Sequence, residues 1–306
     1  MPFLLILFTL FFCWLFCGRY GVFGSKVDWI SQHSVFPDYF RQQFYDTGDF
    51  FPEFAAGIGG GQNIYNFAYY GLYSPVFLLS YLLPFVKMSD YLIAASFTCL
   101  ASAVVLLYFW LIKRGFSQTV SFLTALLFLL SAPMIFQSYN QIMFVNYMPF
   151  LCMALWGVDS FLEKGKPLLY LSGVFLMIMT SFYFSIGGIL VLILYGLHRY
   201  FMLQDSLGKK IRFLDFLRDG IRFLGPILTV LIAGLAWKRR GERILIWSTI
   251  LILTIPFFSY LLNGGLYIRD KVLIPFLPVL CYLIACYMQK QQEEARPLWR
   301  GLLPYI

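Results

Sequence analysis

The run DYLIAASFTCLASAVVLLYFWLIKR, residues 90–114, decides the fold class of this chain. Between Asp90 and the pair Lys113-Arg114, the sequence carries no charged residue. A stretch of about 20 apolar residues is the length that crosses the roughly 30 Å hydrocarbon core of a bilayer. The run therefore predicts a transmembrane helix over Tyr91–Ile112, with its charged ends held outside the hydrocarbon.

The composition of the whole chain agrees with this reading. Of its 306 residues, 60% are hydrophobic and only 12% are charged, whereas soluble domains carry about 25% charged residues. Such a chain cannot fold around a water-facing surface, so soluble enzymes, nucleic-acid modules and secreted disulfide scaffolds are excluded. The six cysteines lie inside apolar runs and are interpreted as small buried hydrophobic side chains.

Further apolar runs predict an all-α polytopic membrane protein with about nine transmembrane helices. We expect a transmembrane domain over residues 1–288 and a short, truncated tail over residues 289–306. Besides Tyr91–Ile112, the expected spans are Pro2–Cys17 with its extension to Phe23, Gln118–Gln137, Met143–Leu162, Leu168–Phe182, Ser185–Phe201, Phe223–Trp237, Ile244–Leu262 and Lys271–Met288.

The net charge of +8 indicates orientation in a cell membrane. Basic residues cluster at the ends of apolar segments, as in Lys113-Arg114 and the loop Glu163–Lys166. Because Lys and Arg are enriched in cytoplasmic loops, these segments and the amino terminus are expected inside. The long segment over about residues 24–90 is then the first outer loop, and no nucleic-acid partner is needed to explain the charge.

One stretch does not fit the alternation of inside and outside loops. Arg199–Arg222 and Lys238–Arg243 are both strongly basic, yet the single run Phe223–Trp237 separates them. Either this run is a re-entrant hairpin, or the chain lacks a loop and half a hairpin that a longer relative would have. The abrupt join at Gly225-Pro226 favours the second interpretation.

The first outer loop is the most informative segment of the chain. It is rich in aromatic, amide and glycine residues and ends in the uncharged run Pro75–Val86. Since loops between spans are usually short, this one predicts a structured cap with helices lying in the membrane interface. The spacing of the cluster Gly57–Gly61 does not fit a nucleotide-binding loop, and no strand is expected before it. The cluster therefore predicts a tight turn.

Several motifs follow one another in an order that carries a resemblance. Asp28 lies shortly after the first span, and it is followed by Gln32, Gly48, Gly57, Gly59 and the run YYGLYSP at Tyr69–Pro75. Together they resemble the first outer loop of the bacterial YfhO membrane-protein family. Further similar motifs are NQIMFVNYMPF at Asn140–Phe150, TSFY at Thr180–Tyr183 and FSYLLNGG at Phe258–Gly265. The resemblance covers nearly the whole chain, which is similar to the amino-terminal membrane portion of longer family members.

The resemblance implies a GT-C type glycosyltransferase of the bacterial plasma membrane. Such an enzyme takes a sugar from a polyprenyl-phosphate carrier and places it on an outer-face acceptor, such as a teichoic-acid-like cell-envelope polymer. In this reading Asp28 is the catalytic base, whereas the alternative is a solvated acid at a helix end. The expected partners are the donor, the acceptor polymer and membrane lipids, with no cofactor and no metal.

The same resemblance suggests residues for the two substrates. Arg269 and Lys271, beside Asn263, are candidates for binding the donor phosphate, or are charges that merely flank the spans. The candidates for substrate contact are polar and aromatic side chains, namely Gln32, His33, Asn63, Tyr69, Tyr70, Asn140, Asn146, Tyr147 and Tyr183. Their alternative roles are interfacial packing, helix capping and hydrogen bonds between helices.

Two functions of other classes remain open at this point. A non-enzymatic polytopic transporter or lipid flippase would place charges in the middle of spans and show inverted repeats, and neither is visible in the sequence. An inactive truncated member of the family would also account for the unusual stretch around Phe223–Trp237.

Overall fold

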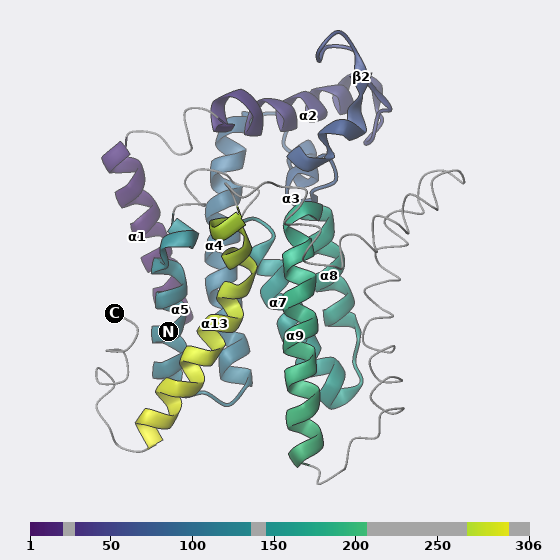
Figure 1. Ribbon diagram of the computed structural model, residues 1–306. Helices are drawn as coiled ribbons and strands as arrows, with labels where there is room; N and C mark the ends of the chain where they lie inside the picture. The colour runs from purple at the N-terminus through teal and green to yellow at the C-terminus, as the bar shows by residue number, and fades with distance from the viewer. Residues whose placement is uncertain (21–27, 136–144, 207–267, 294–306) are drawn as a thin grey trace. The chain divides into compact units, whose positions relative to one another are not determined.

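The computed structural model describes residues 1–20, 28–135, 145–206 and 268–293 (Figure 1). It divides the chain into two compact units, one of Met1–Pro149 with Leu277–Ile306 and one of Phe150–Phe276. Each unit is treated by itself below. The described elements are helices apart from one pair of two-residue strands, which confirms the mostly helical fold that the sequence predicts.

The first unit contains three packed helices, α1 (Pro2–Tyr20), α4 (Met88–Lys113) and α5 (Gln118–Leu130). The carboxyl-terminal part of α13 (Ile268–Glu293) joins them, because Trp110 of α4 stacks on Tyr282 with ring centroids 5.5 Å apart. On α1, Phe3 and Trp14 are each 68% exposed. Large apolar side chains on an outer surface suit a lipid environment better than water.

Two of the described helices are long and apolar enough to cross a membrane, α4 and Phe182–Gln204. Shorter apolar helices within the described ranges cover Pro2–Leu15, Gln118–Leu130, Leu168–Thr180 and Leu277–Cys286. The expected spans Phe223–Trp237 and Ile244–Leu262 lie outside the described residues, as do the first basic cluster from residue 207 onward and the whole of the second. The count of nine spans therefore stays a prediction.

The expected helix over Gln118–Gln137 is wrong at its end, because α5 stops at Leu130. Ser131 has an extended backbone, with ψ of 136°, and its Oγ donates to the carbonyl of Phe128 at 2.8 Å. Pro133 follows two residues later and has no N–H to continue the helical hydrogen bonds. Residues 132–135 then form a separate helical turn.

The next helix also begins later than the expected Met143. Helix α7 covers Met148–Lys164, and a turn precedes it in which the Met148 N–H donates to the Val145 carbonyl at 2.9 Å. Asn146 and Tyr147 therefore lie in this turn and not inside a transmembrane helix. Both side chains are buried.

In the second unit, α8 (Leu168–Thr180) and α9 (Phe182–Ser206) pack together. Ser181 separates them with an extended backbone, φ of −156° and ψ of 95°. The Oγ of Ser185 lies 2.8 Å from the Met177 carbonyl and 2.6 Å from that of Ser181. The sequence predicts a break here, between the expected spans Leu168–Phe182 and Ser185–Phe201. The Ser185 hydroxyl stabilises the break by donating to carbonyls that have no hydrogen-bond partner within the helices.

The segment expected to form the first outer loop is a folded cap with several short elements. These are η1 (Trp29–His33), α2 (Val35–Thr47), β1 (Phe54–Ala55), β2 (Gln62–Asn63), η2 (Ile64–Tyr70), α3 (Pro75–Leu78) and η3 (Leu79–Leu82). A core of Phe40, Ile64, Phe67 and Leu72 holds them together, with further aromatic side chains packed around it. Helix α2 contacts α4 and lies across its amino-terminal end (Figure 1).

The glycine cluster forms the expected tight turn, but the prediction of no strand before it is wrong. Strands β1 and β2 pair antiparallel, with Phe54 opposite Asn63. Gly59, Gly60 and Gly61 between them all have positive φ, of 59°, 79° and 98°. Because glycine adopts these angles without steric cost, the chain reverses tightly enough for the two strands to meet.

Glycines also set how closely α7 and α8 approach within the second unit. A Cβ on Gly157 would lie 2.5 Å from the Cα of Tyr170, and one on Gly173 would lie 2.7 Å from the backbone nitrogen of Ala154. These neighbours are backbone atoms and cannot rotate away. Small residues that allow backbones to touch are the usual means of helix packing in lipid.

We therefore predict that Gly157→Ala and Gly173→Ala each force α7 and α8 apart and lower stability by about 1–3 kcal/mol, as overpacking does in other well-packed cores. The measurement is thermal unfolding of the purified chain in detergent. Ala94→Val adds side-chain volume at an exposed position of α4 and serves as the control. Equal unfolding temperatures for all three variants and the parent chain would contradict this account of the packing.

Candidate functional site

Asp28 begins the cap and lies beside two other predicted site residues. It occupies the position before the first residue of η1 and is partly buried. Its negative charge acts on both His33 and Tyr70: burial lowers the pKa of His33 and Asp28 opposes that decrease, whereas burial raises the pKa of Tyr70 and Asp28 adds to the increase. The structure thus brings together a carboxylate, an imidazole and a phenol that the sequence separates by up to 42 positions, the distance from Asp28 to Tyr70.

A hydrogen bond connects the two segments of the cap that carry this cluster. The Tyr70 hydroxyl donates to Oε1 of Gln32 at 2.8 Å. Gln32 lies in η1 and Tyr70 is the last residue of η2. The bond therefore connects the start of the cap to a helix more than thirty residues later in the chain. Gly71 follows with φ of 96°, which ends η2 in a conformation that favours glycine.

His33 is the most deeply buried polar member of the cluster. It is 3% exposed, and its ring stands edge-on to Tyr70 at a centroid distance of 6.0 Å. Burial lowers its pKa from 6.5 to about 4, against the opposing effect of Asp28. The imidazole is therefore neutral near pH 7, and its Nδ1 is buried without a hydrogen-bond partner among the described residues. A buried polar atom left in this way costs free energy unless a ligand or water satisfies it.

Aromatic rings form one wall beside these polar groups. The ring of Tyr69 stands edge-on to that of Tyr70, with ring centroids 5.3 Å apart. The ring centroids of Phe36 and Tyr70 are 4.5 Å apart. Asn63 has a different position, because its Oδ1 accepts from the Tyr65 N–H at 2.9 Å and caps η2. Asn63 is thus a helix cap in this structure, and its contact with substrate remains a prediction.

The arrangement suits a ligand that has both hydroxyl groups and an apolar face. The carboxylate of Asp28 can accept hydrogen bonds, and the neutral imidazole of His33 can accept or donate one. The tyrosine rings offer flat apolar surface with a polar edge. In the described part of the chain, there is no group of three or more His, Cys, Asp or Glu side chains placed to hold a metal ion.

The remaining predicted site residues belong to other segments of the chain. Tyr183 lies in the second unit, in the first turn of α9, and is partly buried. Asn146 is 2% exposed, and its Nδ2 and Oδ1 are buried with no hydrogen-bond partner in the part of the chain that the structure describes. Asn140 and Asn263 lie outside the described residues. Arg269 and Lys271 lie in the first turn of α13, which begins at Ile268, and their side chains are likewise outside the description.

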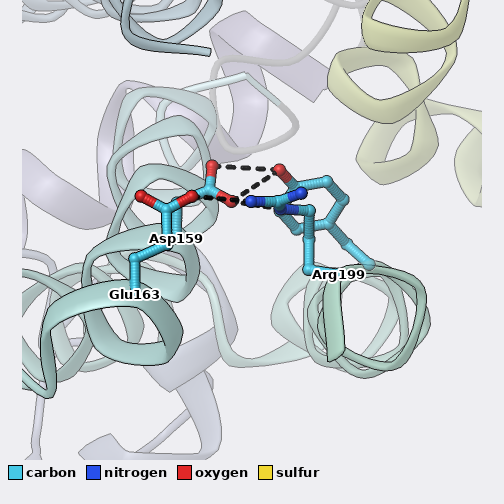
Figure 2. A network of polar contacts seen from close by, with 4 residues as sticks. Asp159, Glu163 and Arg199 are labelled. Atoms are coloured by element: carbon cyan, nitrogen blue, oxygen red, sulfur yellow. Dashed lines mark hydrogen bonds and ion pairs between the residues drawn. The ribbon is translucent and has the colours of Figure 1, made fainter. Parts of the chain in front are cut away.

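The structure also contains a polar network that the sequence did not predict (Figure 2). The Arg199 Nε donates to Asp159 Oδ1 at 2.7 Å, and its Nη2 donates to Glu163 Oε1 at 2.6 Å. The Tyr195 hydroxyl lies 3.0 Å from both carboxylate oxygens of Asp159. Side chains of α7 and α9 thus meet in one network, and Asp159 and Arg199 are almost fully buried.

A signal for this network was present in the sequence. Asp159 and Glu163 lie four residues apart, and so do Tyr195 and Arg199. Residues at this spacing share one face of a helix, so each pair presents complementary groups on an otherwise apolar helix. The basic stretch Arg199–Arg222 was used only to argue on which side of the membrane its loop lies, so the pairing of Arg199 was not predicted.

Comparison with known proteins identifies one related family. The model of a family described as "Bacterial membrane protein YfhO" matches residues 1–236. The matched range includes the whole cap and the network of α7 and α9, whereas the motif at Phe258–Gly265 lies beyond it. Neither the curated proteins nor the solved structures contain a match to the chain.

The buried network yields a prediction about stability. Arg199→Ala leaves the carboxylate of Asp159 buried without its cation, which typically costs about 3–5 kcal/mol. Glu163→Gln is expected to cost less, because the Glu163 side chain is 35% exposed. Thermal unfolding of the two variants measures the difference. A larger loss for Glu163→Gln than for Arg199→Ala would show that the buried pair is not the main contact.

His33 yields a prediction about pH. The unfolded chain binds a proton on this imidazole at a pKa of 6.5, whereas the folded chain does so at about 4. The contribution of His33 to the free energy of unfolding is therefore fully present above about pH 6.5. It decreases as the pH drops toward 4, by on the order of 3 kcal/mol. We expect the unfolding temperature of the parent chain to decrease between these pH values more than that of His33→Gln. The same decrease in both chains would contradict the prediction.

Proposed function

Since the chain belongs to the YfhO family of bacterial membrane proteins, we propose that it is a GT-C type glycosyltransferase. It moves a sugar from a polyprenyl-phosphate carrier to an acceptor on the outer face of the cell membrane, such as a teichoic-acid-like cell-envelope polymer. The observation that carries the proposal is the cluster of Asp28, His33, Gln32 and Tyr70 in the folded cap. It combines a candidate base with groups suited to binding a sugar.

The proposed chemistry assigns one step to Asp28. Its carboxylate accepts the proton of an acceptor hydroxyl while the hydroxyl oxygen attacks the anomeric carbon of the donor sugar. The new C–O bond forms as the bond between that carbon and the phosphate oxygen breaks, and the electron pair leaves with the polyprenyl phosphate. Position near the hydroxyl matters more than basicity for such a group, and Asp28 begins a short helix that η2 holds in place through Gln32 and Tyr70.

His33 and the aromatic wall would orient the acceptor. A neutral imidazole beside Asp28 can hydrogen-bond a second hydroxyl of the acceptor without competing for the proton. Tyr69 and Tyr70 would stack on a sugar ring. Arg269, Lys271 and Asn263 are proposed to bind the departing phosphate, because developing negative charge is stabilised by cations and amide donors. Asn140, Asn146, Tyr147 and Tyr183 are proposed to contact the substrates.

The proposed topology places this chemistry on the outer side. The protein is a membrane protein, and we propose that it is multi-pass in the bacterial plasma membrane with a cytoplasmic amino terminus. Its partners would be the lipid-linked donor, the acceptor polymer and membrane lipids.

A transporter or flippase remains the alternative, and the described charges favour the enzyme. Asp159 and Arg199 lie within the last two turns of α7 and α9 and satisfy each other. Charges that move a substrate are expected deeper in a span and open to a cavity. The network is better explained as a connection between two helices.

Replacement of Asp28 tests the proposed reaction. Because positioned general bases typically contribute about 10²–10⁴-fold to rate, Asp28→Asn is expected to reduce the sugar content of the cell-envelope polymer to that of cells lacking the protein. The measurement is sugar analysis of the purified polymer, with the protein level followed by immunoblot.

Asp46→Asn is the matched control. Asp46 is an exposed acid of the same cap, and its carboxylate contacts the Gln42 side chain on the surface of α2. This variant is expected to retain the parent sugar content. Unchanged sugar content with Asp28→Asn at normal protein levels would contradict the proposed role of Asp28.

A further inference from the structure

The helix that follows Asp28 begins with a turn that is wider than an α-helical turn. The Ser34 N–H donates to the Trp29 carbonyl, five residues back, at 3.0 Å, whereas an α-helix joins residues four apart. Ser34 has helical backbone angles, with φ of −92° and ψ of −30°, so η1 continues into α2 without a break. We call Trp29–Ser34 the π turn. Such turns are rare and are frequent at functional sites.

Pro37 explains why a wider turn lies at this point. It is the third residue of α2 and has no N–H to donate to the His33 carbonyl, four residues back. In a regular α-helix its ring would also collide with that carbonyl. An unmodified α-helix therefore cannot run from Asp28 through Pro37, and a turn with one additional residue accommodates the proline.

The additional residue decides which side chains of this helix are buried. Trp29 and Arg41 are twelve positions apart and are 5% and 7% exposed. At about 100° per residue, an uninterrupted α-helix would place them about 120° apart around its axis. One residue absorbed in the π turn reduces this angle to about 20°, so both lie on the buried side. The same rotation applies to Asp28, which directly precedes Trp29.

The π turn also brings neighbouring side chains to one partner. Gln32 accepts a hydrogen bond from the Tyr70 hydroxyl at 2.8 Å, and the adjacent His33 stands edge-on to the Tyr70 ring. Adjacent residues diverge less around the axis in a π turn than in an α-helix, because more residues complete each turn. The wider turn therefore favours contact of both residues with Tyr70.

Ser34 holds the π turn with its side chain as well as its backbone. Its Oγ donates to the Trp29 carbonyl at 2.9 Å and lies 3.4 Å from the Ile30 carbonyl. A serine within an α-helix bonds the carbonyl three or four positions back, but the shorter bond here is to the residue five positions back. The hydroxyl therefore favours the π turn over an α-helical turn.

We propose that Ser34 is a positioning residue for the sugar transfer. Its hydroxyl fixes the π turn, and the π turn places the Asp28 carboxylate on the side of the helix that faces His33 and Tyr70. The role in transfer rests on the proposed function, whereas the placement of Asp28 by Ser34 does not. Ser34 acts through Asp28 and takes no proton itself.

Histidine NMR tests the placement without relying on activity. The chain has two histidines, so ¹⁵N-histidine labelling of the full chain in lipid nanodiscs gives ring signals that His33→Gln assigns. Asp28→Asn is expected to shift the His33 signals, because the Asp28 charge acts on this imidazole. In a Ser34→Ala chain the same replacement of Asp28 is expected to give a clearly smaller shift. Ser34→Thr keeps the hydroxyl and is expected to restore the full shift.

Kinetics tests the consequence for transfer. The full chain in vesicles receives polyprenyl phosphates that carry radiolabelled hexoses, together with a teichoic-acid-like polymer. We expect Ser34→Ala to lower kcat by about 10–100-fold with an unchanged KM for the donor, because a misplaced base costs rate and not binding. Ser34→Thr is expected to retain the parent kcat.

Thr47→Ala is the matched control. It removes a hydroxyl that donates to the Gln43 carbonyl at 2.7 Å, at the exposed end of the same helix, and is expected to keep the parent kcat. Unfolding temperatures of Ser34→Ala and Thr47→Ala are compared to establish that the cap remains folded. Ser34→Cys, whose thiol is a weak donor, replaces Ser34→Ala if that chain does not fold.

The outcomes separate this inference from the proposed function. An equal Asp28→Asn shift at His33 with and without the Ser34 hydroxyl would overturn it, as would a parent kcat in Ser34→Ala. An equal loss of kcat in Ser34→Ala and Ser34→Thr would also overturn it, because the hydroxyl would not be the deciding group. If the parent chain transfers no sugar, the proposed function fails, and the shift at His33 decides whether Ser34 places Asp28.

Discussion

The position of the cap depends on one buried cation. Arg41 is 7% exposed, and its guanidinium holds the carbonyl of Val86 at 2.9 Å and the carboxylate of Asp38 at 3.2 Å. Val86 lies two residues before α4, the helix on which the first unit is built. This side chain of α2 therefore connects the cap to the start of a long apolar helix, alongside the hydroxyl of Tyr91 in α4, which donates to the Val76 carbonyl. Removing Arg41 would leave a carboxylate and a carbonyl without their shared partner.

The candidate site depends on this connection. Asp28, Gln32 and His33 precede α2, and Tyr70 reaches them from the other end of the cap through its bond to Gln32. Burial lowers the pKa of His33, and its imidazole is therefore neutral near pH 7. The burial of His33 within the cap thus sets the charge of the imidazole beside Asp28.

Much of this could be predicted from the sequence, because charge scarcity and apolar run length are local properties. Tyr91–Ile112 was placed correctly within α4, and the residues around Asp28 were chosen from their order in the outer loop. The end of α5 at Leu130 was missed because the apolar pattern continues past Ser131 and Pro133. The pairing of Arg199 with Asp159 was missed because the two residues lie 40 positions apart, on different helices. Spacing within one helix does not say which helices meet.

The central claim is that this chain transfers sugar from a lipid carrier at its outer cap. The most direct measurement supplies the purified full chain in vesicles with polyprenyl phosphates that carry different radiolabelled sugars, together with a teichoic-acid-like polymer. The account predicts that the label from one of these donors appears in the polymer while an equal amount of free polyprenyl phosphate is released. Intact donors throughout, with a folded chain that binds them, would contradict it.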